Sequence, residues 1–398
     1  MSDGDPLLRF RAEFPILGHT NYLVSNSLGA MPRSVPDRLA GYAEAWAQYG
    51  VRAWAREWWQ MPGMVGDAIA PLIGASSGEV VMMPNVTAAQ TTILSAFSYR
   101  APRNRIVMTA LDFPSVMYAY KALATRLGAE VVVVPSSDGI GVDEEQLLAA
   151  IDERTALVAI SHVLFKSAYI MDVARITRHA HDAGALVSLD AFHSVGVMPV
   201  DVKASGADFL TGGVLKWLCG GPGGCFLYAA PESTRDLQPS VTGWMAHARP
   251  FAFETDMDYA EGAYRWLGGT PAIPAIYAAI EGPQIVGKAG IAAIREKSIR
   301  QTTRLVELAD DRGFRIHVPR DSSRRGGTVA FDVPNAREVA QTLLDRDILV
   351  DFRPGAGIRL APHFYTRDEE LEEAVAAIDD ILLTGAWSKH AGRSSVVT

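Results

Sequence analysis

The chain has few cysteines and no long apolar run. Cys219 and Cys225 are its only cysteines among 398 residues, and no group of histidines accompanies them. Such a pair argues against a disulfide framework and a zinc site, so we expect no bound metal. No stretch reaches the roughly 18 apolar residues of a membrane helix, and the N-terminal MSDGDPLLRFRAEF lacks the apolar core of a secretory signal. We therefore expect a cytoplasmic protein with no membrane partner.

Positive charge is also scarce. The chain carries 37 lysines and arginines against 45 aspartates and glutamates, a net charge of −8. This balance provides no general basic surface, so we expect no nucleic-acid partner. A hydrophobic fraction of 48% is enough for a sizeable core, and the length suggests two or three domains.

Apolar strand patterns alternate with helical patterns between about residues 80 and 230. RIVMTA and EVVVVP enclose the helical VMYAYKALATRLG, whose Gly128 is a candidate C-cap; LVAISHV, a helix through RITRHAHDAG, and ALVSLD follow. This order is typical of an α/β fold with a mostly parallel sheet and helices on both faces. Ligands of such folds bind outside the carboxyl ends of the strands, where His162 and Asp190 are expected.

A change in composition near EGPQIVGKAG predicts a domain boundary. We expect a large domain over residues 46–284 and a smaller α+β domain over residues 285–398. Residues 1–45 are expected to form an N-terminal arm that belongs to the small domain.

Asp190 and Lys216 are the first candidates for chemistry. Asp190 ends the apolar run VSLD, and a carboxylate at the end of a buried strand costs free energy unless it is paired. The protonated ring nitrogen of pyridoxal phosphate (PLP) would be such a partner. Lys216 lies between Leu215 and Trp217, where partial desolvation favours the neutral amine that forms a Schiff base. The alternative is a strand-end aspartate and a lysine that extends from an apolar patch.

Two segments could surround a phosphate. PNVTAAQTTILSAF predicts a helix that begins after Asn85 and has Thr87 in its first turn, where free N–H groups, the helix dipole and a hydroxyl would meet an anion. The alternative is that either residue only caps the helix. The GGPGG segment fits neither a dinucleotide fingerprint nor a P-loop, and it predicts a tight turn into the strand CFLYA.

Seven separated motifs together resemble kynureninase, a member of the class V aminotransferase group of fold-type I PLP enzymes. They occur in the order of that family: YLVSNSLGAMPRSV, ISHVLFKSAYIMDV, LDAFHSVG, LKWL with GGPG, TGWMAHARPFAFE, GGTPAIP and IRLAPHFYT. The resemblance spans nearly the whole chain. It implies the fold-type I PLP-dependent transferase fold, PLP as cofactor, a small-molecule amino acid as substrate, and a homodimer whose subunits share active sites.

The resemblance also implies a role for single residues of the cofactor site. Lys216 is the Schiff-base lysine, Asp190 is the partner of the pyridine nitrogen, and these two with His193 form the catalytic set. Phe113 is the aromatic residue that stacks on the cofactor ring. The phosphate contacts are Val86, Thr87 and Trp244, and Thr270 is brought across the dimer interface to the other subunit's site.

For the substrate, the resemblance implies three contacts. Arg359, in IRLAP, matches the arginine that binds the α-carboxylate, a task suited to a planar bidentate donor. Asn26 and Ser27, in the NSLG segment, are the other expected contacts.

The chain departs from the family's pattern beside the lysine. Leu215 occupies the position of a tyrosine that contacts phosphate and takes part in proton transfer, and Val214 occupies a Ser/Thr position. The family's pattern has an aspartate after the residues FPS, and this chain has Val116 at that position. Tyr264 or His162 could supply the missing hydroxyl or proton-transfer group.

Four functions can be compared with these features. The motif set favours a kynureninase-like hydrolase that cleaves the Cβ–Cγ bond of a β-acyl amino acid. The missing tyrosine favours a class V aminotransferase or a C–S lyase. Cysteine desulfurase is disfavoured, because it needs a mobile nucleophilic cysteine in the small domain and the chain has no cysteine after Cys225. A non-catalytic PLP-binding protein is disfavoured because Lys216, Asp190 and Arg359 are all retained.

The segment YAEAWAQYGVRAWAREWW concentrates aromatic residues near the N-terminus. Some of its members could line a pocket for an aromatic or extended amino acid. The alternative is an amphipathic helix and loop buried at a dimer interface. The aromatic residues concerned are Trp46, Tyr49, Trp54, Trp58 and Trp59.

Overall fold

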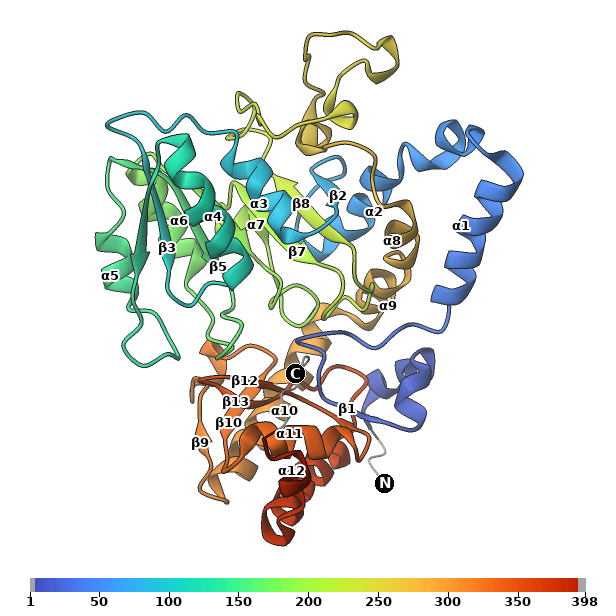
Figure 1. Ribbon diagram of the computed structural model, residues 1–398, viewed down its shortest axis with the longest axis vertical. Coiled ribbons are helices and arrows are strands. Elements are labelled where there is room, and N and C mark those ends of the chain that lie inside the picture. The colour runs from blue at the N-terminus through green and yellow to red at the C-terminus, as the bar shows by residue number, and fades with distance from the viewer. Residues whose placement is uncertain (1–3, 393–398) are drawn as a thin grey trace.

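A seven-stranded sheet with helices on both faces forms the larger part of the protein (Figure 1). The computed structural model describes residues 4–392. In spatial order the strands are β2 (Val80–Met83), β8 (Cys225–Ala229), β7 (Phe209–Gly213), β6 (Leu186–Asp190), β5 (Thr155–Ser161), β3 (Arg105–Thr109) and β4 (Glu130–Val134).

The sheet is mostly parallel, as the alternating pattern predicts. Strands β7, β6, β5, β3 and β4 run parallel, whereas β8 is antiparallel to both of its neighbours, β7 and β2. The carboxyl ends of β3, β5 and β6 therefore meet at one edge, where a ligand can be bound by the loops that follow them.

Successive strand residues face two different hydrophobic cores, as a period of two requires. Val80 and Met82 of β2 pack into the core formed with α2 and α6, whereas Val81 and Met83 pack into the core formed with α3 and α4. The helices of this region are α1 (Val35–Tyr49), α2 (Met61–Ile69), α3 (Val86–Leu94), α4 (Pro114–Leu127), α5 (Glu144–Ala149), α6 (Val173–Asp182), α7 (Val202–Ser205), α8 (Ile273–Ala278) and α9 (Glu281–Ala289).

Local sequence signals explain several element boundaries. Helix α4 begins at Pro114, whose fixed φ suits a first helical position, and ends before Gly128, which is left-handed with φ 77°. The GGPGG segment makes the expected turn, with positive φ at Gly221 and Gly223, and leads into β8.

A second core lies in the lower, orange and red part of Figure 1. An antiparallel sheet with the order β12, β13, β10, β9 packs against three helices. The elements are α10 (Ile291–Asp310), β9 (Arg315–Ile316), β10 (Val329–Asp332), α11 (Ala336–Leu344), β11 (Ile348–Leu349), β12 (Asp351–Arg353), β13 (Gly357–Leu360) and α12 (Asp368–Thr384). The domain boundaries given above stay a prediction.

The N-terminal arm contacts elements of this second part, although most of its buried apolar residues, such as Leu7, Phe14 and Leu17, belong to the first core. Strand β1 (Asn21–Tyr22) pairs in parallel with β11, and the Arg11 guanidinium donates to both carboxylate oxygens of Glu370 at 2.9 and 2.6 Å. Over residues 4–392, no helix is long and apolar enough to cross a membrane.

Candidate active site

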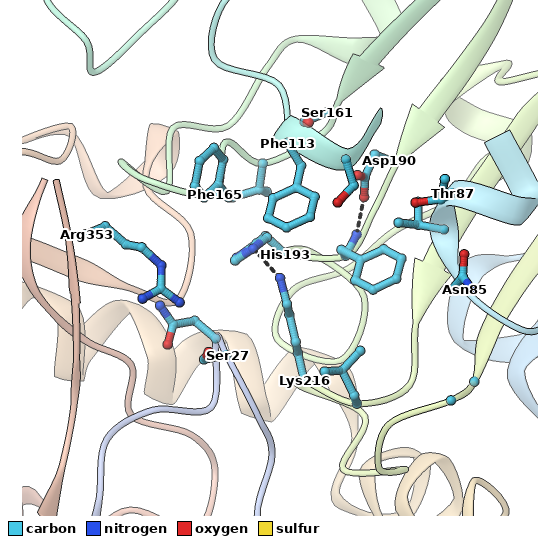
Figure 2. Close-up of a pocket in the computed structure, with 18 of the residues that line it drawn as sticks. Ser27, Asn85, Thr87, Phe113, Ser161, Phe165, Asp190, His193, Lys216 and Arg353 are labelled. Atoms are coloured by element: carbon cyan, nitrogen blue, oxygen red, sulfur yellow. Dashed lines mark hydrogen bonds between the residues drawn. The ribbon is translucent and has the colours of Figure 1, made fainter. Parts of the chain in front are cut away.

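A cavity of about 350 Å³ opens at the carboxyl ends of the parallel strands (Figure 2). Its walls come from both cores and from the N-terminal arm. The lining residues are Asn26, Ser27, Pro84, Asn85, Val86, Thr87, Phe113, Ser115, Ser161, Val163, Phe165, Asp190, Phe192, His193, Leu215, Lys216, Gly223, Gly224, Arg353 and Arg359.

Lys216 reaches into the cavity from the loop between β7 and β8. Its Nζ lies 2.6 Å from Nε2 of His193, and it lies 5.5 and 5.4 Å from the ring centroids of Phe113 and Phe192. Burial lowers the pKa of Lys216 to about 7, and the arginines Arg353 and Arg359 add to this effect, although Asp190 opposes it. Burial also holds the pKa of His193 well below its usual range, so the imidazole is a neutral partner for the amine. Lys216 is therefore available as a neutral nucleophile near neutral pH.

Asp190 is the last residue of β6, as the sequence predicts. Its Oδ1 accepts a hydrogen bond of 2.9 Å from the backbone N–H of Phe192. Burial raises the pKa of Asp190 to about 6, against the opposing effects of that hydrogen bond and of Lys216. A buried carboxylate with this environment is stabilised by any cationic ligand group that enters the cavity.

The N-terminus of α3 forms the opposite side of the cavity from Arg353 (Figure 2). Asn85 caps this helix because its Oδ1 accepts from the N–H of Ala88 at 2.9 Å. Val86 and Thr87 come before Ala88 in the first turn, and their amides have no acceptor within the helix. Both residues lie in the cavity wall. The cap and the anion site are therefore compatible, since one amide is used by the cap and others remain for a phosphate.

The residues present fit PLP. Helix amides and the Thr87 hydroxyl suit its phosphate, the buried carboxylate of Asp190 suits a protonated ring nitrogen, and the Phe113 ring suits its aromatic face. The amine of Lys216 suits its aldehyde.

Arg359 is almost completely buried, at 2% exposure, and it is already paired. Its Nε and Nη2 donate to the two oxygens of Asp351 at 2.7 and 2.5 Å, and its Nη1 donates to the carbonyl oxygen of Phe165. Arg353 also lines the cavity, and its Nη2 lies 3.2 Å from Oδ2 of Asp351.

Asn26 is a buried polar residue without a partner. It is 1% exposed, and among residues 4–392 neither its side-chain nitrogen nor its side-chain oxygen has a hydrogen-bond partner. Because such groups are costly to bury unpaired, its amide is available to a ligand in the cavity. Ser27 lines the cavity beside it.

Nine of the predicted site residues line this cavity, but Trp244 and Thr270 do not. The Trp244 indole is 39% exposed and donates to the carbonyl oxygen of Pro250 at 2.6 Å. Thr270 is expected at the site of another subunit, and its position outside this chain's cavity is compatible with that expectation.

The three departures from the family pattern have different surroundings. Leu215 lines the cavity, whereas Val116 and Val214 are buried in the two cores beside the sheet. Neither proposed substitute for the missing tyrosine reaches this chain's cavity. His162 is buried outside it, and the Tyr264 hydroxyl donates to the carbonyl oxygen of Gln60 at 3.3 Å.

Eleven lining residues lie outside the predicted set, among them Ser161, Phe165, Phe192 and Arg353. Phe192 stands within the quoted motif LDAFHSVG, so its spacing from Asp190 could have revealed it, whereas Arg353 lies outside every quoted motif. Ser161 and Phe165 follow from the rule that residues at and after strand ends line ligand sites.

The aromatic N-terminal segment does not line the cavity. Trp58 is buried, its ring stacks on Tyr42 at 5.5 Å, and its Nε1 donates to the Tyr277 hydroxyl at 3.3 Å. Trp46 is 60% exposed on α1. The pocket interpretation of this segment is therefore wrong within a single chain.

Comparisons with known proteins find matches over most of the chain. A family profile described as "Aminotransferase class-V" matches residues 21–358. A kynureninase from Pseudomonas fluorescens is 32% identical over 400 residues, which cover 97% of this chain and 94% of the relative.

Two solved structures share the fold. A cysteine desulfurase from Thermococcus onnurineus NA1 superposes with a TM-score of 0.84 at 23% identity, covering 96% of this chain and 99% of that one. A C-DES variant with glycine covalently linked to the PLP cofactor superposes with a TM-score of 0.85 at 20% identity, covering 93% and 99%. The predicted fold class and the resemblance to kynureninase are confirmed.

Proposed function

Because the chain belongs to the class-V aminotransferase family, we propose that it is a PLP-dependent enzyme that acts on an amino acid. The reaction we propose is kynureninase-like hydrolysis of the Cβ–Cγ bond of a β-acyl amino acid. The similarity to kynureninase over nearly the whole chain supports this choice.

The observation that carries the proposal is the contact between Lys216 and His193. The two side chains meet at 2.6 Å inside a cavity that also holds the buried carboxylate of Asp190. A lysine with a lowered pKa, next to a neutral histidine, can attack an aldehyde and can later accept or return a proton at the substrate's α-carbon.

Bound PLP would supply an electron sink for the bonds around the substrate's α-carbon. In this proposal the chain holds the group through Lys216, Asp190 and the amides of Val86 and Thr87. Phe113 and His193 fix the plane of its ring. Asn26, Ser27 and Arg359 bind and orient the amino acid, and Leu215 and Phe165 form an apolar part of the wall around it.

A homodimer with shared sites forms part of the proposal. Trp244 and Thr270, both implied in the cofactor site, lie outside the cavity of their own chain. Trp244 belongs to an exposed aromatic cluster with Trp59, Phe251 and Phe253. A second subunit would cover this cluster and receive these residues at its site.

A class V aminotransferase or C–S lyase is the second candidate. Leu215 lines the cavity where the family's tyrosine is expected, so the hydroxyl for proton transfer is missing from this wall. The chain has no cysteine after Cys225, which disfavours cysteine desulfurase despite the shared fold.

The test incubates the purified holoprotein with kynurenine and with hydroxykynurenine. We expect alanine and an anthranilate as products. A keto acid from the amino donor would instead support the aminotransferase, and pyruvate from a cysteine conjugate would support the C–S lyase.

Lys216→Ala tests the cofactor assignment. We expect loss of the visible absorbance of covalently held PLP, because this side chain supplies the amine. Lys203→Ala is the control, since its Nζ pairs with Glu79 outside the cavity at 2.8 Å. Unchanged absorbance in Lys216→Ala would refute the assignment.

A further inference from the structure

Three charged side chains lie on one face of the hairpin formed by β12 and β13. Asp351 stands directly opposite Arg359 in the antiparallel register. Arg353 is two residues from Asp351 on the same strand, so the two side chains share a face. Phe352, between them, packs on the other face against the second core.

Asp351 is saturated by Arg359 alone. It is fully buried, and its two oxygens accept from Nε and Nη2 of Arg359 at 2.7 and 2.5 Å, a bidentate pair. The 3.2 Å contact from Arg353 to the same carboxylate is therefore not needed to neutralise it. The three groups together carry one net positive charge.

This positive charge has no protein counter-ion at its end of the cavity. Among the described side chains that line the cavity, Asp190 is the only carboxylate, and Figure 2 shows it on the side of Thr87, away from Arg353. An excess charge beside a buried ion pair is unfavourable unless an anion joins it. The end of the cavity near Arg353 is thus prepared for one carboxylate.

Both guanidinium groups can still donate. Arg359 uses Nε, Nη2 and Nη1 on Asp351 and Phe165, and Arg353 uses Nη1 on the carbonyl oxygen of Phe352 at 2.8 Å. A guanidinium has more N–H groups than these bonds consume. Arg353 lines the cavity and keeps 31% of its side chain exposed, so its remaining donors are accessible to a ligand.

We propose that Arg353 and Arg359 bind the substrate's α-carboxylate together, and that Asp351 is a positioning residue that holds both guanidinium groups. The proposal rests on the proposed function, since it assigns a second carboxylate-binding arginine to the same site. If Arg353 served only as a counter-charge for Asp351, its loss would weaken the binding of amino acids and of simple amines equally.

The experiment compares kynurenine with kynuramine, the amine that lacks only the α-carboxylate. Each is mixed rapidly with the holoprotein at several concentrations, and its Kd is read from the first change in cofactor absorbance, which precedes product formation. For Arg353→Gln we expect the Kd of kynurenine to rise about tenfold or more and that of kynuramine to stay within about twofold. Arg353→Lys, which keeps the charge without the planar fork, should restore part of the affinity for kynurenine.

Two further variants complete the design. Asp351→Asn should weaken the binding of kynurenine selectively, since the guanidinium groups lose the carboxylate that fixes their orientation. Arg312→Gln is the matched control, because Arg312 is a partly exposed arginine that pairs with Asp379 at 2.6 Å outside the cavity. Circular dichroism confirms that each variant is folded.

The outcomes separate the two proposals. If the unsubstituted protein responds to kynurenine and Arg353→Gln keeps the ratio of the two Kd values, the inference is wrong and the proposed function stands. If neither compound alters the cofactor absorbance of the unsubstituted protein, the proposed function fails and the inference fails with it.

Discussion

The side chain of Lys216 has a pH dependence that its surroundings set. Burial lowers its pKa to about 7, from a usual value of 10.5. The amine is protonated and unreactive below this pKa and neutral above it. We therefore expect the apoprotein to capture PLP with a rate that rises with pH and has its midpoint near 7. Trapping with borohydride across about pH 5 to 9, followed by peptide mapping, measures this rate.

The exposed Lys203 provides an internal reference in the same peptide maps. Its side chain is 48% exposed and lies outside the cavity. Labelling of Lys216 that begins only near the pH range of ordinary lysines would contradict the role of burial.

Leu215 lines the cavity next to Lys216 in sequence, and we expect it to influence the choice of reaction. A tyrosine at this position would bring a hydroxyl to the cavity wall beside Lys216, where it could donate a proton. We expect Leu215→Tyr to raise the ratio of alanine to keto acid formed from kynurenine by about tenfold or more.

Leu215→Phe is the control for that change, because it adds the ring without the hydroxyl. Equal product ratios in the tyrosine and phenylalanine variants would show that the hydroxyl has no part in the reaction. Product analysis by chromatography after single incubations gives both ratios.

At the scale of elements, the contact of α2 with β2 depends on a glycine. A Cβ at Gly66 would lie 2.1 Å from the carbonyl oxygen of Val80, and backbone cannot move as a side-chain tip does. We expect Gly66→Ala to lower the free energy of unfolding by about 1–3 kcal/mol or more.

Gly41→Ala is the matched control on α1. Nothing lies within 4 Å of a Cβ there, so the gain in helix propensity should stabilise the protein by about 0.5–1 kcal/mol. Denaturant unfolding of both variants should give shifts of opposite sign. A stable Gly66→Ala variant would mean that α2 can move away from β2.

Elements with local signals could be predicted from the sequence, and elements defined by distant partners could not. Helix α4 has Pro114 at its start and Gly128 after its end, and β8 is the predicted strand CFLYA. The antiparallel insertion of β8 between β7 and β2 depends on pairing between residues far apart in sequence. No periodicity reports such pairing.

The same division applies to the site. Asp190, Lys216 and Arg359 follow from motifs, each on its own strand or loop. Asp351 and Arg353 gain meaning only from the register that sets Asp351 opposite Arg359. The position of Trp244 outside the cavity likewise could not be predicted from its motif, since it depends on how the loop after β8 folds.

At the scale of the whole molecule, the cavity lies between parts that pack into different cores. Lys216 and Asp190 belong to loops and strands of the large sheet, whereas Arg353 and Arg359 belong to the hairpin beside the second core. The contact between Arg359 and the carbonyl oxygen of Phe165 joins the two parts. Substrate binding at the arginines would therefore strengthen the contact between them.

The yellow loop at the top of Figure 1 contains aromatic residues whose side chains are exposed and that the proposed dimer would bury. Phe251 and Phe253 are 60% and 75% exposed, and they pack with Trp244. We expect the protein to be a dimer by light scattering and Phe253→Asp to shift it toward monomer. Leu383→Asp is the control, because Leu383 is 89% exposed on α12 and outside this cluster.

Sharing of sites is tested by mixing two inactive variants. Lys216→Ala removes the amine from one chain, and Thr270→Arg places a bulky charge where the proposal has a residue crossing to the other subunit. Mixed dimers would contain one site with both normal residues, so random reassortment should restore up to about a quarter of the unsubstituted activity. If Thr270 acted within its own chain, no mixed dimer would contain a complete site. Mixtures that stay inactive, although mass spectrometry shows that the subunits have exchanged, would therefore rule out sharing.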